Sequence, residues 1–313
     1  MTRAPVSMSV MGAMTVIYLV WGSTYLAVAF VVDTMPPLIA SGLRFVLAGL
    51  LIGGLVWGFR GRRALFPRGR AILTAGGIGI IMIGIGNAAL ALAVRYVDSG
   101  LAALIIAITP VWIALLRLTV GQRPAVMTWL GIAIGLVGVV ALIGPSDRAV
   151  GSVLWAGVLI AGSVAWAFAS FLTTRVEMPP DAFAGAAWEM LIGGGASLLM
   201  GVAVGEQVGD LWSADSRSWI AFGYLSVVAA LAFAVYVWLL TNAPISLVAT
   251  YAYVNPVVAV TLGVLFNGER VTVGLLTGGV IVLLGVVLVV GGERPHRAPA
   301  KDSVPAGHPG DVG

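Results

Sequence analysis

Long apolar segments alternate with short polar connections along most of this chain. A helix that crosses the hydrocarbon core of a bilayer needs about 20 mostly apolar residues, whereas a barrel strand needs only about 9–11 alternating ones. The pattern therefore predicts an all-α polytopic membrane protein with ten transmembrane helices. The expected spans are Val10–Val32, Leu38–Phe59, Ala71–Val94, Ser99–Leu116, Ala125–Gly144, Val150–Thr174, Ala182–Gly205, Trp219–Thr241, Ile245–Phe266 and Val271–Gly291.

The composition supports this class, because 60% of the 313 residues are apolar and only 10% are charged. Soluble domains are about 45–50% apolar and about 25% charged. The chain has no cysteine, and both histidines, His296 and His308, lie in the polar stretch after the last span. Disulfides, thiolate nucleophiles and Cys/His metal sites are thereby excluded, and we expect neither a metal nor a cofactor.

Basic residues are distributed unevenly between the two sides that ten spans define. Of the 17, twelve fall on the side that holds both termini, five of them between Arg60 and Arg70, and four fall on the other side. Arg44 alone lies within a span. Because positive charge is retained on the cytoplasmic side, we predict that both termini are cytoplasmic. The first span is too long for a signal peptide and is expected to be retained.

The sequence repeats itself after about 145 residues. Each half holds five spans, an odd number, so the second half must enter the membrane with the opposite orientation. Inverted repeats of this kind are typical of secondary transporters. We expect residues 10–144 and 150–291 to form the two repeats and 292–313 to form a disordered polar tail. The repeat aligns Trp21 with Trp166, Asp33-Thr-Met-Pro-Pro37 with Glu177-Met-Pro-Pro180, Thr109-Pro110-Val111 with Asn255-Pro256-Val257, and Gly138 with Gly285.

The order and duplication of these motifs resemble the EamA family of the drug/metabolite transporter superfamily. The resemblance covers residues 10–291 and implies two EamA domains, ten helices and a central cavity, with no fixed substrate. It also implies a structural or gating role for the Leu-Arg-Phe motif around Arg44. The motifs that carry it are WGSTYLA from Trp21, Pro36-Pro37, Leu43-Arg44-Phe45, Gly86-Asn87, Ser99-Gly100-Leu101, Trp129-Leu-Gly-Ile-Ala-Ile-Gly-Leu, Ala165-Trp166-Ala-Phe, Tyr251-Ala-Tyr-Val-Asn-Pro256 and Gly268-Glu269.

Two formal charges lie well inside spans, Arg44 and Glu189, in equivalent helices of the two repeats. Each costs about 2.5–3.5 kcal/mol on insertion scales, so each should face a cavity or the other charge. One hypothesis is a cavity pair that recognises a zwitterion or couples a proton. The alternative for Arg44 is a structural tether that bonds carbonyls or extends to the membrane surface. A carboxylate at Glu189 could exchange protons between two states of a transporter.

Other candidates are paired prolines, aromatic residues and amides within the spans. Pro110 and Pro256 occupy matching places, and each frees the carbonyl four residues earlier, which predicts either a hinge or a static kink. Tyrosine and tryptophan suit a cavity for small amphipathic solutes, although packing and interfacial positions are the alternatives. Asn87 either lines a cavity or bonds neighbouring helices, and Asn255 bonds either a carbonyl that Pro256 frees or a substrate. The candidates for the substrate pathway beside the two charges are Trp21, Tyr25, Asn87, Trp166, Tyr251 and Asn255.

The predicted function is export of small amphipathic metabolites, amino acids or drugs by alternating access across a bacterial inner membrane. No Walker, HExxH or GxSxG motif occurs, so neither ATP-driven transport nor an enzyme is expected. A transporter of nucleotide sugars or other phosphorylated metabolites is the first alternative, and it needs several basic cavity residues. A membrane scaffold is the second. The expected partners are a small-molecule substrate and the lipid bilayer, without nucleic acid, and a monomer is favoured over an oligomer.

Overall fold

The computed structural model describes residues 8–122, 125–143, 149–173, 175–243 and 251–292, and within these ranges it contains helices and no strand. The expected tail from 293 onward lies outside the described residues, whereas Gly292 still belongs to the last helix. The elements are α1 Met8–Thr34, α2 Pro37–Arg60, α3 Arg62–Leu65, α4 Gly69–Gly79, η1 Ile80–Asn87, α5 Ala88–Ala93, α6 Ser99–Ile106, α7 Thr109–Leu118, α8 Val126–Ile143, α9 Ala149–Thr173, α10 Ala182–Ala203, η2 Val208–Ser213, α11 Ser216–Asn242, α13 Tyr251–Asn267 and α14 Val273–Gly292.

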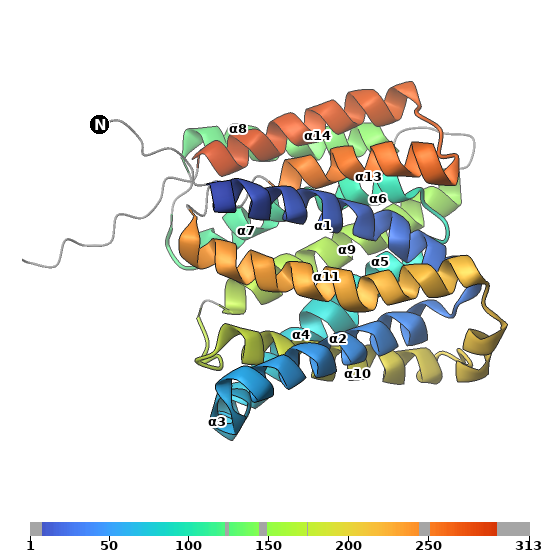
Figure 1. Ribbon diagram of the computed structural model, residues 1–313. Helices are drawn as coiled ribbons and strands as arrows, with labels where there is room; N and C mark the ends of the chain where they lie inside the picture. The colour runs from blue at the N-terminus through green and yellow to red at the C-terminus, as the bar shows by residue number, and fades with distance from the viewer. Residues whose placement is uncertain (1–7, 123–124, 144–148, 174, 244–250, 293–313) are drawn as a thin grey trace, which may run out of the picture.

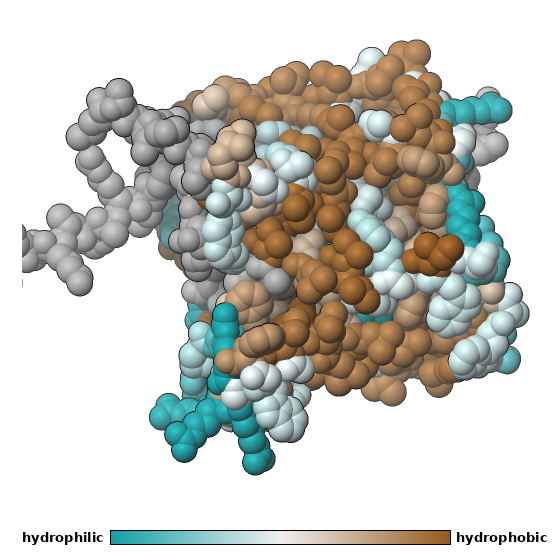
Figure 2. Space-filling view, in the orientation of Figure 1, coloured by the Kyte–Doolittle hydropathy of each residue, from teal (hydrophilic) through white to brown (hydrophobic). Residues whose placement is uncertain are grey.

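The predicted all-α membrane fold is confirmed. Eight helical segments are long and apolar enough to cross a bilayer, and the shorter apolar helices α8 and α13 account for the fifth and ninth spans. Hydrophobic side chains cover the middle of the molecule, and hydrophilic ones gather at its two ends (Figure 2). Six of the residues expected in the ninth span, 245–250, lie outside the described ranges.

Two expected spans are interrupted rather than continuous α-helices. The third consists of α4, the π-helix η1 and α5, because a glycine-rich run surrounds the wider π turns. The fourth breaks between α6 and α7, because Pro110 lacks the N–H that an uninterrupted helix would bond to Ile106. The carbonyl of Ile106 instead accepts a hydrogen bond from Thr109 Oγ1 at 2.6 Å.

The two repeats are interleaved rather than set side by side. Helix α2 packs extensively on its counterpart α10, and α8 does so on its counterpart α14. The first helix of each repeat packs on the other repeat, α1 on α11 and α13, and α9 on η1, α5 and α7. In Figure 1, α8 and α14 lie along one edge, α2 and α10 along the other, and α1, α9, α11 and α13 lie between them.

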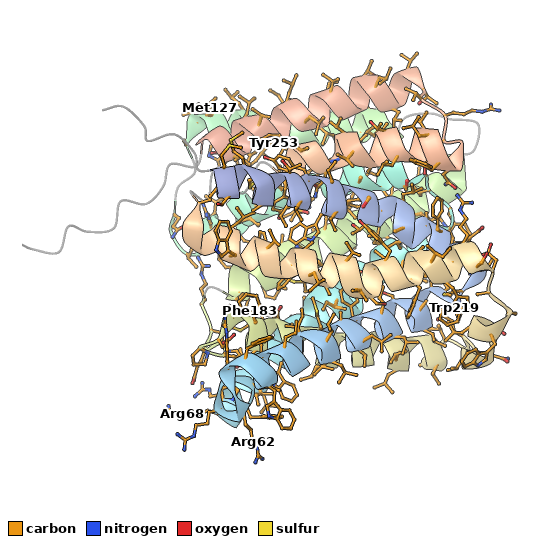
Figure 3. All side chains as sticks on the ribbon, in the orientation of Figure 1. Arg62, Arg68, Met127, Phe183, Trp219 and Tyr253 are labelled. Carbon is orange, nitrogen blue, oxygen red and sulfur yellow. The ribbon has the colours of Figure 1, made fainter. Side chains whose placement is uncertain are left out.

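The described chain begins and ends at one end of the bundle, where Arg62 and Arg68 also lie (Figure 3). We call this end the arginine face. The other end, which carries Trp219, is the opposite face. A common side for both ends of the chain is what an even number of spans requires.

Glycine makes the crossings of counterpart helices possible. A Cβ atom built on Gly131 of α8 would lie 2.6 Å from the carbonyl oxygen of Gly285 in α14. One built on Gly285 would lie 2.6 Å from the Cα atom of Gly135. Between α2 and α10, Gly42 and Gly194 approach each other's backbone in the same way. Small residues allow this proximity, which increases van der Waals contact between helices in lipid.

We predict that Gly285→Ala lowers the free energy of unfolding by about 1–3 kcal/mol, because the added methyl group must separate two backbones. Gly223→Ala is the matched control, since a Cβ there meets no atom within 4 Å. The control should leave stability unchanged or raise it by up to about 1 kcal/mol, as alanine favours helix. Unfolding in detergent measures both, and equal stability of the two variants would contradict the prediction.

Candidate functional site

A cavity of ≈ 250 Å³ lies in the middle of the bundle, between the two repeats. The first repeat contributes α1, α2, η1, α5, α6 and α7 to its wall, and the second contributes α9, α10, α11 and α13. The structure brings all ten sequence-predicted candidates to this cavity. They are Trp21, Tyr25, Arg44, Asn87, Pro110, Trp166, Glu189, Tyr251, Asn255 and Pro256.

Arg44 is held in place by an amide. Its side chain is buried, with the residue 6% exposed, and Nη2 donates to Asn87 Oδ1 at 2.6 Å. The guanidinium also lies 4.1 Å from the ring centre of Phe45, a cation–π arrangement. Ser41 Oγ donates to the same Asn87 oxygen at 3.3 Å. The π-helix ends at Asn87, so this unusual backbone segment positions the amide opposite α2.

Glu189 lines the cavity from α10 and is partly buried. Within the described chain, no hydrogen bond or ion pair joins its carboxylate to another residue, and Arg44 bonds Asn87 instead. Both side chains line the cavity, and no direct ion pair joins Arg44 to Glu189 in this conformation of the described chain. The cavity contains a tethered cation and a carboxylate to which no described residue bonds, both on the side formed by α2, η1 and α10.

The matching prolines act differently in the two repeats. Pro110 begins α7, whereas Pro256 lies inside the continuous helix α13. Next to Pro256, Asn255 is 5% exposed, and its Oδ1 atom has no hydrogen-bond partner in the described chain. A buried carbonyl oxygen without a partner costs about 1–3 kcal/mol. An arriving donor would remove that cost.

An aromatic cluster lies beside the cavity, and Trp21, Phe233 and Tyr251 of this cluster line it. The ring of Trp21 lies 4.8 Å from that of Tyr236 and 5.2 Å from that of Tyr251, the latter edge-on, and Phe233 lies 6.5 Å from it. These residues come from α1, α11 and α13. Phe233 and Tyr236 were not among the predicted candidates. No repeat partner, proline or charge marks them in the sequence, and only the packing of α1 on α11 reveals them.

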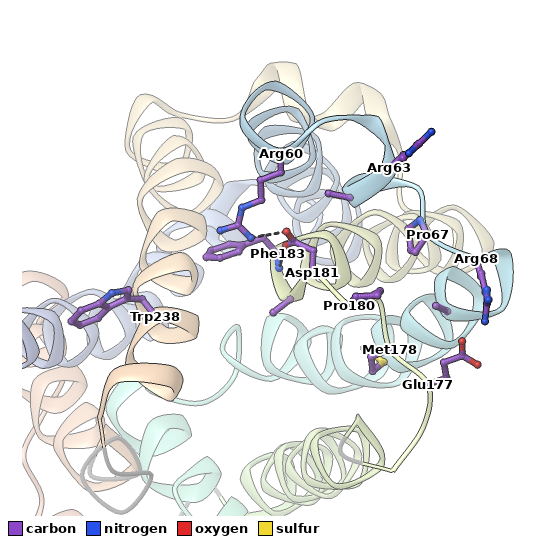
Figure 4. Close-up of a pocket in the computed structure, with 13 residues that line it drawn as sticks. Arg60, Arg63, Pro67, Arg68, Glu177, Met178, Pro180, Asp181, Phe183 and Trp238 are labelled. Carbon is purple, nitrogen blue, oxygen red and sulfur yellow. Dashed lines mark hydrogen bonds and ion pairs between the residues drawn. The ribbon is translucent and has the colours of Figure 1, made fainter.

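A second, larger chamber of ≈ 970 Å³ opens on the arginine face (Figure 4). Its wall includes Arg60, Arg63, Arg68, Glu177 and Asp181. Arg60 Nη1 donates to Asp181 Oδ2 at 2.6 Å, which is the dashed line in Figure 4. Partial burial would raise the pKa of Asp181, but the bond from Arg60 and two backbone N–H groups of α10 outweigh it and hold that pKa below its ordinary value.

A profile of the EamA-like transporter family matches residues 8–144 and 153–291, which together are most of the chain. The chain belongs to the EamA-like transporter family. It is an integral membrane protein, and the residues around the central cavity line the interior of a transporter.

Two named relatives support this assignment. The uncharacterized inner membrane transporter YedA of Escherichia coli K12 is 36% identical over 297 residues, 94% of each chain. Protein PagO of Salmonella typhimurium is 31% identical over 126 residues, which are 40% of this chain and 41% of that one. One solved structure, described as "Crystal structure of protein", has the same fold, with a TM-score of 0.64, 21% identity, and coverage of 90% of this chain and 96% of that one.

We predict that Asn87→Ala lowers the free energy of unfolding by about 1–3 kcal/mol, because it leaves a buried guanidinium without its acceptor. Arg44→Met combined with Asn87→Ala should cost less than the sum of the two single changes, with a coupling of about 0.5–3 kcal/mol. Unfolding the unmodified protein, the two single variants and the double variant in detergent measures this coupling energy as a double-mutant cycle. Asn267→Ala, at the exposed end of α13, is the control. Additive effects of the two changes would show that the bond has no energetic weight.

Proposed function

We propose that this protein is a secondary transporter that exports small amphipathic metabolites, amino acids or drugs across a bacterial inner membrane. The observation that carries the proposal is the central cavity, which both inverted repeats line with polar and aromatic side chains. Two interleaved bundles of opposite orientation have two mirror-related arrangements, each opening the shared cavity to one side. Alternating access follows from exchange between them.

The two sides of the cavity suit the two ends of an amphipathic solute. The rings of Trp21, Phe233 and Tyr251 offer apolar area for one end. Arg44, Asn87 and Glu189 supply charge and hydrogen bonds for the other. The Oδ1 atom of Asn255 is buried and has no partner in the described chain, so a donor on the bound molecule reaches it only when the helices around the cavity move.

Glu189 is the candidate for coupling transport to protons. A carboxylate that faces a closed cavity is costly when charged, and its proton affinity changes when the cavity opens to water. A proton taken up on one side and released on the other would then accompany each cycle. Facilitated diffusion is the alternative, in which Glu189 binds substrate without exchanging protons.

The contents of the cavity favour this class over the alternatives. A nucleotide-sugar transporter needs several cations for phosphate, and Arg44, already bonded to Asn87, is the one basic residue among those described as lining the central cavity. A lipid-modifying enzyme or a scaffold does not require a cavity with polar side chains that two repeats enclose. The family and the relative YedA are named as transporters, which agrees with a protein that is not an enzyme.

We predict that Glu189→Gln abolishes proton-driven flux, reducing it by about tenfold or more, while substrate binding is retained. Reconstituted vesicles with and without a pH gradient measure this, with solutes first identified by a toxicity screen of cells that over-produce the chain. Glu177→Gln, on the chamber wall at the arginine face, is the control and should keep the gradient response. Full gradient-driven flux in Glu189→Gln would reject Glu189 as the coupling residue, and flux in the unmodified protein that ignores the pH gradient would indicate facilitated diffusion.

We also propose that the arginine face is cytoplasmic, because twelve of the 17 basic residues fall on the side of the termini. Reporter fusions at residues 1 and 313 should both report the cytoplasm, and a fusion in the loop at Gly209 should report the other side. Termini on different faces would contradict an even number of spans. Both termini outside would reverse the orientation and the direction of transport.

A further inference from the structure

On each face of the membrane, one repeat binds the N-terminus of the counterpart helix in the other repeat. On the opposite face, Glu206 follows α10 and accepts from the first turn of α2, from Leu38 N at 3.1 Å and from Ile39 N at 2.8 Å. On the arginine face, Arg60 ends α2 and donates to Asp181, the N-cap of α10. The inverted repeat makes these two contacts equivalent in place, although the charge that reaches across has the opposite sign.

The arginine-face contact also positions an aromatic ring on the chamber wall. Asp181 Oδ1 accepts from Phe183 N at 2.9 Å, and the guanidinium of Arg60 lies 4.7 Å from the ring centre of Phe183. Figure 4 shows this ring beside the ion pair. Phe183 lines the chamber, whereas Ala186, less than one helical turn further along α10, lines the central cavity. The two spaces are therefore neighbours along α10, with Phe183 at their boundary.

The two contacts differ in strength. The side chain of Arg60 is 50% exposed, and an ion pair in such a place is weak. Glu206 uses both carboxylate oxygens on two backbone N–H groups at the positive end of a helix, which is a stronger arrangement. On the same opposite face, Glu269 binds the start of α6 through Ser99 N at 2.9 Å, Ser99 Oγ at 2.6 Å and Gly100 N at 3.1 Å.

We propose that Arg60, Asp181 and Phe183 form a gate between the chamber and the central cavity, and that Glu206 is the matching latch on the opposite face. The inference rests on the proposed transport function. Opening to the arginine face separates Arg60 from Asp181 and releases Phe183 while Glu206 keeps α2 fixed. Opening to the opposite face breaks the Glu206 contacts while the ion pair persists. The two contacts are positioning devices that decide which side of the membrane reaches the cavity.

The absence of cysteine from the sequence permits a direct test. Ala229→Cys places one thiol on the cavity wall, and a membrane-impermeant maleimide is applied to right-side-out and to inverted vesicles. Adding Asp181→Asn keeps the N-cap but removes the charge. It should speed labelling from the arginine face about two- to fivefold, because the loss of an exposed ion pair changes an equilibrium by about that factor. Adding Glu206→Gln instead should speed labelling from the opposite face about tenfold.

Controls separate gating from general loosening. Asp215→Asn makes the same chemical change at the N-cap of α11 on the opposite face and should not change labelling from the arginine face. Arg60→Gln should match Asp181→Asn without adding to it, and Arg60→Lys should restore slow labelling. Equal acceleration from both faces, or none from the arginine face, would overturn the gate.

Labelling needs no transported substrate, so failures of the two proposals remain distinguishable. Sided labelling without flux would retain the gate and reject the transport proposal. Flux without any change in labelling would retain the transport proposal and reject the gate. If Asp181→Asn is poorly folded, Phe183→Ala tests the same boundary and should accelerate labelling from the arginine face alone.

Discussion

Close backbone contact between counterpart helices is the constraint on which this structure depends. Gly131 and Gly285 allow α8 and α14 to touch, and Gly42 and Gly194 do the same for α2 and α10. Lipid offers little hydrophobic force to drive helices together, so tight packing must supply the attraction. These two crossings lie along opposite edges of the bundle. Helices α2 and α10 of one crossing form the wall of the cavity together with the helices that lie between the two edges.

The cavity is polar on one side because polar groups there are stabilised by one another. Asn87 accepts a hydrogen bond from Arg44, and the π-helix that ends at Asn87 sets the position of that amide. Glu189 and Asn255 Oδ1 have no such partner in the described chain. In a medium without water, groups of this kind are retained only where a function uses them. The structure thus separates the polar groups that support the fold from Glu189, which lines the cavity where a solute would bind.

Much of this arrangement was predictable from residue order, and the remainder depends on contacts between distant segments. Span length, the odd number of spans in each repeat and the isolated charges at Arg44 and Glu189 predicted the helices, their inversion and a shared cavity. The partner of Arg44 was not predicted, because helix depth gives position along the membrane normal but not rotation about the axis. The same holds for Tyr236 and Glu206, whose contacts come from the other repeat.

The π-helix Ile80–Asn87 has a consequence for how this segment can vary. A π turn accommodates one residue more than an α turn, and one residue corresponds to about 100° of rotation about the helix axis. Regular α winding over the same residues would turn everything beyond them by about that angle, whereas deleting one residue at the same time would cancel the turn. With all eight residues wound as an α-helix, the amide of Asn87 would point away from α2, so the direction of this one side chain depends on the wider turns.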